Sequence, residues 1–211
     1  EANNLLRAYK YIYSKKCPKK LTTRLIKKIH RFVMKNISDR AGEYRVEPWA
    51  IFNEAGNVVY VAPLHTEIPD MMDHLISHGQ NMTDSPAIVS AVLQFLFEKI
   101  HPFADGNGRV GRLISTHIMN KSGYGFGGLV SPEAAVDRER DGYYKGLEPS
   151  KEVTTFVQFY IQCFVDEAKG TFEKLSTQVN ISLIDLLDLR RQEIVRIIKD
   201  HPYINFDSIQ R

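Results

Sequence analysis

Apolar residues recur along most of this chain with the spacing of an α-helix, and the clearest run starts at residue 86. Ser85 followed by Pro86 is typical of a helix N-terminus, with serine as the capping residue. The mostly apolar run that follows predicts a buried helix, and it ends at His101 because a residue before proline avoids the helical region. The apolar positions are Ile88, Val89, Val92, Leu93, Phe95, Leu96 and Ile100.

A second helix is expected from about Arg109 to Lys121, with Gly123 closing it. Its apolar positions follow the spacing i, i+3, i+4, i+7 and i+8, which predicts one buried face. These positions are Val110, Leu113, Ile114, His117 and Ile118. A short loop therefore joins two buried helices, with Gly106-Asn107-Gly108 at the N-terminus of the second.

Further helices are expected before and after this pair. Thr22 or Thr23 caps one helix, another runs from Pro69 to about His78 and ends at Gly79, and a long one runs from Phe156 to Leu175. Two short runs at residues 49–52 and 58–61 are instead β-branched or aromatic and flank a turn that contains Gly56, which predicts a β-hairpin. The fold class is therefore all-α, with one small hairpin.

Composition fits an ordinary globular domain of 211 residues, 43% hydrophobic and 25% charged. A formal net charge of +3 is too small to indicate a nucleic-acid-binding protein. Cys17 and Cys163 lie far apart, which argues against a disulfide framework and favours a reducing compartment. No apolar run is long enough to cross a bilayer, so we expect a cytoplasmic protein without a membrane partner.

The run from His101 to Arg112 concentrates groups that handle a polyphosphate. The first turn of a helix presents unpaired N–H groups and partial positive charge, and Gly106 and Gly108 let a phosphate approach the backbone. Arg109 and Arg112 are three residues apart, so two guanidinium groups lie on neighbouring positions of one helical face.

Two further residues of this run suggest chemistry beyond anion binding. A carboxylate at Asp105 would repel a bare phosphate, so it makes sense mainly as a ligand of Mg²⁺ shared with a nucleotide. His101 titrates near neutrality and could accept a proton from an attacking hydroxyl.

The run from His101 to Arg112 has two other interpretations. Residues 106–111 satisfy the dinucleotide pattern G-x-G-x-x-G, but that fingerprint requires a preceding strand, whereas a helix precedes it here. A charge-rich turn without function remains as the second alternative. The other histidines, such as His30 and His117, are expected to be surface or packing residues.

The same run matches the Fic family signature, His-x-Phe-x-(Asp/Glu)-Gly-Asn-Gly-Arg-x-x-Arg, at every fixed position, and the chain resembles that family. The resemblance implies a Fic-fold helical bundle in residues 1–180, with the hairpin (about 49–63) as a flap over an active site at loop 101–112. It implies that His101 is the general base, assisted by Arg109 and Asn107, and that Asp105 holds the metal. The implied nucleotide-binding set is Phe103, as an anchor under the loop, with Gly106, Asn107, Gly108, Arg109, Gly111 and Arg112.

Fic proteins are mostly adenylyltransferases, so the implied activity is transfer of AMP from Mg-ATP to a Ser, Thr or Tyr hydroxyl of a target protein or of the chain itself. Gly106 and Gly108 favour AMP transfer over the kinase activity of the Doc branch, which departs from the pattern there. Other nucleotidyl, phosphoryl or phosphocholine transfer by the same site, and a nucleotide-sensing DNA-linked regulator, stand as alternatives.

The hairpin also resembles the Fic flap, which follows an Ala-Gly-x-Tyr-Arg segment, here Ala41 to Arg45. By that resemblance the target peptide docks along Val61, Ala62, Pro63 and Leu64 by strand addition. The alternative is a hairpin that only covers the core.

Regulation and partners are expected from the same resemblance. The inhibitory motif (Ser/Thr)-x-x-x-Glu-(Gly/Asn) is absent, so any inhibitory helix is expected to lie upstream of Glu1 or on another chain. Residues 181–211 form a helical extension that resembles the start of a winged-helix domain, so DNA is a partner only if a full winged helix follows. A homodimer is left open.

Overall fold

The computed structural model describes residues 1–52, 55–148 and 153–178 of the chain. It contains helices α1 (Ala2–Tyr13), α2 (Thr23–Val33), α3 (Ile68–Asn81), α4 (Pro86–Ile100), α5 (Asn107–Lys121), α6 (Pro132–Arg138), α7 (Arg140–Gly146) and α8 (Thr154–Gln178), with a 3₁₀ turn η1 (Phe126–Gly128). Strands β1 (Ala50–Phe52) and β2 (Val58–Val61) form an antiparallel pair. The all-α class with one hairpin is therefore confirmed.

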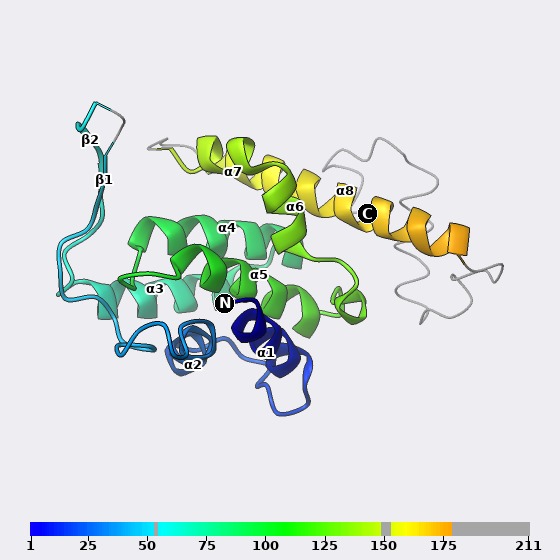
Figure 1. Ribbon diagram of the computed structural model, residues 1–211, viewed down its shortest axis with the longest axis horizontal. Coiled ribbons are helices and arrows are strands. Elements are labelled where there is room, and N and C mark those ends of the chain that lie inside the picture. The colour runs from blue at the N-terminus through cyan, green and yellow to red at the C-terminus, as the bar shows by residue number, and fades with distance from the viewer. Residues whose placement is uncertain (53–54, 149–152, 179–211) are drawn as a thin grey trace.

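Helices α4 and α5 are the centre of the fold (Figure 1). Helices α1 and α2 pack on one side of α5, and α7 and α8 lie on the opposite side of the molecule, where α8 packs on α4. One apolar core lies among α1 to α5 and includes Phe97 and Phe103, which are fully buried. A second core lies between α4 and α8 around Phe156.

The helix ends largely follow the capping signals. The Thr22 and Ser85 side chains accept hydrogen bonds from the backbone N–H groups of Leu25 and Ile88. Helix α5 begins at Asn107, two residues before the expected start. Within the described residues, no helix combines the length and apolar character that a membrane span requires.

One predicted helix end was wrong. Gly79 lies inside α3, which continues to Asn81. A Cβ at Gly79 would lie 2.4 Å from Cδ1 of Leu93, so the glycine allows α3 to pack closely on α4. Gly79 therefore has a packing role and does not mark the end of the helix. The predicted extension 181–211 lies outside the described residues.

Candidate active site

The loop between α4 and α5 turns sharply at two left-handed residues. His101 caps α4 with φ 48° and ψ 59°, an uncommon conformation for a residue with a side chain. Gly106 caps α5 with φ 80°, and a Cβ there would lie 2.9 Å from Sδ of Met34. These two turns bring the His101 side chain next to the N-terminus of α5.

Asn107 and Phe103 hold the loop in this shape. The Asn107 amide oxygen accepts from the Phe103 N–H at 2.9 Å, and its Nδ2 donates to the Phe103 carbonyl at 2.7 Å. The side chain of Asn107 is therefore committed to the loop, while its backbone N–H lies in the first turn of α5.

His30 of α2 supports the loop from behind. Its ring stacks on Phe103 with 3.8 Å between centroids. Its Nδ1 accepts from the Gly42 N–H at 2.7 Å, so Nε2 carries the proton and donates to the Asp105 carbonyl at 3.1 Å. Burial lowers the pKa of His30, which keeps this tautomer neutral. His30 is thus a packing residue, as expected, but one that fixes the loop backbone.

A cavity of about 600 Å³ opens at the N-terminus of α5. Seven of the predicted site residues line it: His101, Asp105, Gly106, Asn107, Gly108, Arg109 and Arg112. Phe103 and Gly111 do not line it. Phe103 is the buried anchor under the loop, and a Cβ at Gly111 would lie 2.8 Å from Oε1 of Glu98, so Gly111 allows α5 to approach α4.

The two arginines of α5 both have carboxylate partners. Arg109 pairs with Glu1 and, at 3.3 Å, with Asp105. Arg112 forms a bidentate pair with Glu133 of α6, with Nε and Nη2 at 2.7 and 2.6 Å from the two carboxylate oxygens. Burial alone would lower the pKa of Arg112, but the hydrogen bonds and charge of Glu133, together with Tyr143 and Glu98, raise it overall.

A buried polar group lies behind Arg112. Burial raises the pKa of Glu98 to about 7, although Arg112 and a hydrogen bond to Tyr143 favour the charged form. Gln94 donates to the Tyr143 hydroxyl at 2.7 Å, and the Arg112 guanidinium lies 5.8 Å from the Tyr143 ring centroid. The arginine therefore sits between an aromatic ring and two carboxyl groups.

The surroundings of His101 favour its neutral form. Trp49 stacks on the imidazole with 3.5 Å between ring centroids. Burial, with help from the charge of Arg45, lowers the pKa of His101 to about 4, against opposing effects of the Glu98 backbone and of Asp105. His101 is therefore a proton acceptor at pH 7.

Arg45 connects the hairpin to the loop between α4 and α5. This residue is 2% exposed, and its guanidinium donates to the carbonyls of His101, Glu47 and Pro63 at 2.8, 3.0 and 2.6 Å. On the hairpin, Val61 and Leu64 are exposed (65% and 63%). Pro63 is half-buried, and Ala62 is buried and donates its N–H to the Trp49 carbonyl. The outward side chains of the predicted docking segment are thus Val61 and Leu64.

A second cavity of about 680 Å³ adjoins the first. Both cavities are lined by Trp49, His101, Gly108, Arg112 and Tyr144. Tyr60, Tyr143 and Leu147 also line the second cavity, which gives it a more apolar wall next to the loop between α4 and α5.

Three residues of the site were not identified from the sequence. Arg45 is only the last residue of the segment that precedes the hairpin, and no sequence pattern marks Glu133. Glu98 had a weak signal, because it is a carboxylate within the apolar run that predicts a buried helix. What makes Arg45 and Glu133 important is their distance to residues far away in the sequence.

Comparison with known proteins agrees with this geometry. The model of the Fic/DOC family matches residues 20–119. The chain is 28% identical over 153 residues to a protein adenylyltransferase Fic of Drosophila mojavensis, covering 68% of this chain and 27% of the relative. It is 29% identical over 116 residues to a Fido domain-containing protein of Dictyostelium discoideum, covering 54% of this chain and 74% of that protein.

A solved Fic family protein from Desulfovibrio desulfuricans shares the fold, with a TM-score of 0.70 and 26% identity over 85% of this chain and 54% of that one. The chain spans between a quarter and a third of the length of the adenylyltransferases it matches. Residues 20–119 therefore match the Fic/DOC family, and the chain is similar to Fic proteins in sequence and in fold.

Proposed function

We propose that this chain transfers AMP from Mg-ATP to a hydroxyl group of a protein side chain. The observation that carries the proposal is the meeting of three features in one cavity. These are a neutral, half-buried His101, the unpaired N–H groups at the start of α5, and the two guanidinium groups of Arg109 and Arg112. Relatives named protein adenylyltransferase support the same reaction.

In this proposal the polyphosphate binds at the N-terminus of α5, where the backbone N–H groups and Arg109 neutralise its charge. Arg112, in the second turn of α5, contributes a further positive charge. The nucleoside occupies the adjoining cavity, whose aromatic wall suits a base and a sugar. Two adjoining cavities, one polar and one more apolar, match the two ends of a nucleotide.

The chemical step needs one proton transfer and one displacement. His101 takes the proton of the target hydroxyl, the hydroxyl oxygen bonds to the α-phosphorus, and the bond from that phosphorus to the bridging oxygen breaks. Pyrophosphate leaves. The N–H groups and guanidinium groups stabilise the charge that develops on the phosphate oxygens.

Asp105 fits a magnesium site of the kind that the nucleotide completes. Its side chain is 68% exposed at the cavity and supplies a hard carboxylate oxygen. In this proposal Asp105 supplies one ligand, and phosphate oxygens and water supply the others, as is usual for Mg²⁺. When bound, the ion would supply charge neutralisation on the phosphates.

Labelling tests the proposal directly. The purified chain is incubated with Mg²⁺ and ATP labelled at either the α- or the γ-phosphate, followed by denaturing gels and intact mass, with His101→Ala as control. Label from α-ATP alone, lost in His101→Ala, is the expected result.

Label from γ-ATP alone would show a phosphoryl transfer and overturn AMP transfer. Label that persists in His101→Ala would exclude His101 as the base. If neither label is transferred, even with candidate target proteins present, while ATP binds by calorimetry, the nucleotide-sensor alternative replaces the proposal.

A further inference from the structure

The basic residues of this chain are distributed unevenly. Residues 2–38 contain 11 lysines and arginines and no aspartate or glutamate. The rest of the chain has 17 lysines and arginines and all 25 acidic residues. The small net charge of +3 therefore conceals a strongly basic segment and an acidic remainder.

This segment forms one layer of the fold. Helices α1 and α2 and the loop between them pack on the same side of α5, away from α7 and α8 (Figure 1). Ten of the basic side chains are exposed, and Lys27 is half-buried. We call these residues the basic surface: Arg7, Lys10, Lys15, Lys16, Lys19, Lys20, Arg24, Lys27, Lys28, Arg31 and Lys35.

The charges of the basic surface are not neutralised by the protein. In the portion of the chain that the structure describes, none of the 11 residues forms an ion pair. One carboxylate at the margin, Asp73 of α3, accepts a hydrogen bond from the Thr23 hydroxyl at 2.9 Å. Uncompensated like charges repel one another, so an external polyanion would relieve that repulsion.

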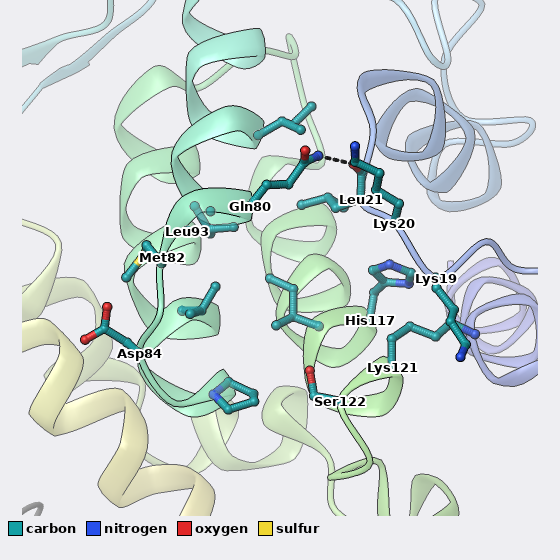
Figure 2. A pocket seen from close by; sticks show the side chains of 15 residues that line it. Lys19, Lys20, Leu21, Gln80, Met82, Asp84, Leu93, His117, Lys121 and Ser122 are labelled. Carbon is teal, nitrogen blue, oxygen red and sulfur yellow. Dashed lines mark hydrogen bonds between the residues drawn. The ribbon is translucent and has the colours of Figure 1, made fainter. Parts of the chain in front are cut away.

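One end of the basic surface borders a cavity of about 350 Å³ at the C-terminal end of α5 (Figure 2). Lys19, Lys20 and Lys121 lie on one side of this cavity, and Met82 and Asp84 lie on the other. The Lys121 ammonium also donates to the Ile12 carbonyl at 3.2 Å. The lysines of the α1–α2 loop are thus joined by a further lysine from α5.

We propose that the basic surface binds the phosphate backbone of nucleic acid. Lysine makes point-charge contacts with phosphates and is depleted in protein–protein interfaces, so eight lysines among 11 basic residues disfavour a protein partner. A membrane surface would be expected to receive apolar side chains. Residues 2–38 expose only Leu6 and Ile37 among their large hydrophobic residues, and neither lies in the loop with four lysines.

Binding would be non-specific in sequence. The contacts are phosphates, and no base-reading residues are needed, so the dissociation constant is expected near 10⁻⁴–10⁻⁶ M at physiological salt. Nucleic acid on this surface would lie next to Arg7 and the start of α1, where Glu1 pairs with Arg109. The inference does not depend on AMP transfer.

Fluorescence anisotropy with labelled 20-mer duplex DNA, single-stranded DNA and RNA tests this, at 50 and 200 mM salt. The charge-removing pair Lys19→Gln/Lys20→Gln is compared with Lys169→Gln/Lys174→Gln on α8, which has the same charge change on the opposite side. We expect binding at 50 mM salt that weakens at least about tenfold at 200 mM. The surface pair should lower the slope of log K against log salt by up to about 2, and the α8 pair should leave it unchanged.

No binding to any of the three probes at 50 mM salt would overturn the proposal. Equal weakening by both variant pairs would also overturn it, because the surface would then act only through net charge. Tighter binding to vesicles with 30% phosphatidylserine, or to polyglutamate, than to nucleic acid would assign the surface to a membrane or to an acidic protein instead. Circular dichroism checks that each variant is folded.

Discussion

Arg112 shows how a single side chain of the motif is oriented by its neighbours. Glu133 takes Nε and Nη2, which leaves Nη1 next to Gly108, where a Cβ would lie 3.2 Å from it. The pair is mostly buried, with 12% and 16% of the two side chains exposed, so solvent screens it only weakly. Glu133 therefore acts as a positioning residue that directs the remaining guanidinium edge toward Gly108 at the start of α5.

Replacing Glu133 tests this role. Glu133→Ala should lower kcat/KM for ATP about tenfold, because the guanidinium loses its orientation. Glu133→Gln, which keeps an accepting oxygen, should retain most of the activity. Steady-state kinetics and ATP titration calorimetry measure both effects. A rise in kcat/KM for Glu133→Ala would mean that Glu133 competes with the nucleotide for Arg112.

Gly106 is required for a conformational and a steric reason. Gly106→Ala should cost about 1–2 kcal/mol in the free energy of unfolding through its positive φ, and should abolish AMP transfer because the added Cβ meets Met34 under the loop. Gly56→Ala is the matched control, with φ 77° but no atom within 4 Å of an added Cβ. Urea unfolding and labelling should show that both variants lose stability and that only Gly106→Ala loses activity.

At the scale of elements, the hairpin depends on anchors outside its own strands. A two-stranded pair is marginally stable alone. Here Tyr60 donates its hydroxyl to the Lys99 carbonyl of α4, and Arg45 bonds to carbonyls at the start and end of the hairpin and at His101. The hairpin and the backbone of His101 are thus held by one buried guanidinium.

Arg45→Lys should detach the flap. A lysine cannot donate to three carbonyls in the fork geometry of arginine, so at least one buried acceptor loses its partner, at about 1–3 kcal/mol. Hydrogen exchange of residues 46–64 should accelerate, and transfer to a target protein should fall more than ATP binding does. Arg40→Lys is the control, since Arg40 is 40% exposed and pairs with Glu43 and Glu47. Unchanged exchange in Arg45→Lys would contradict this role.

At the scale of the whole molecule, acid should destabilise the fold through buried histidines. Burial, assisted by Lys121, lowers the pKa of His117 to about 4 from an ordinary value of 6.5. The unfolded state then binds more protons between these values, so stability is full above about pH 6.5 and is lost as pH falls toward 4. The pKa values of His101 and His30 are also lowered, so both residues add to this loss of stability in acid.

His117→Leu isolates this effect. Protonation of His117 alone lowers the free energy of unfolding at pH 5 by about 2 kcal/mol. The decrease in the free energy of unfolding from pH 7 to pH 5 should therefore be smaller by about this amount in the variant. His78→Gln, at an exposed position of α3, should leave the difference unchanged. Urea unfolding at the two pH values measures this, and an unaltered difference in His117→Leu would contradict the assignment.

The features of the fold that could be predicted from the sequence are those that local interactions determine. The starts of α2 and α4, the hairpin and the buried stripe of α5 follow from caps and periodicity, which depend on residues a few positions apart. The end of α3 did not follow from its sequence, because Gly79 is explained by Leu93 of another helix. The places of Phe103 and Gly111 in the structure likewise depend on contacts across the core. Phe103 is buried under the loop, and Gly111, which was predicted to bind nucleotide, instead allows α5 to approach α4.

The sequence by itself determined the helical class, the hairpin and the run from His101 to Arg112, because spacing and residue type are enough to define a loop at a helix N-terminus. Only the tertiary structure decided what that loop can do. It stacked His101 on Trp49, committed the Asn107 side chain to Phe103, and gave Arg112 its partner Glu133. Such contacts join residues distant along the chain, and their free energies depend on burial and geometry that no local pattern encodes.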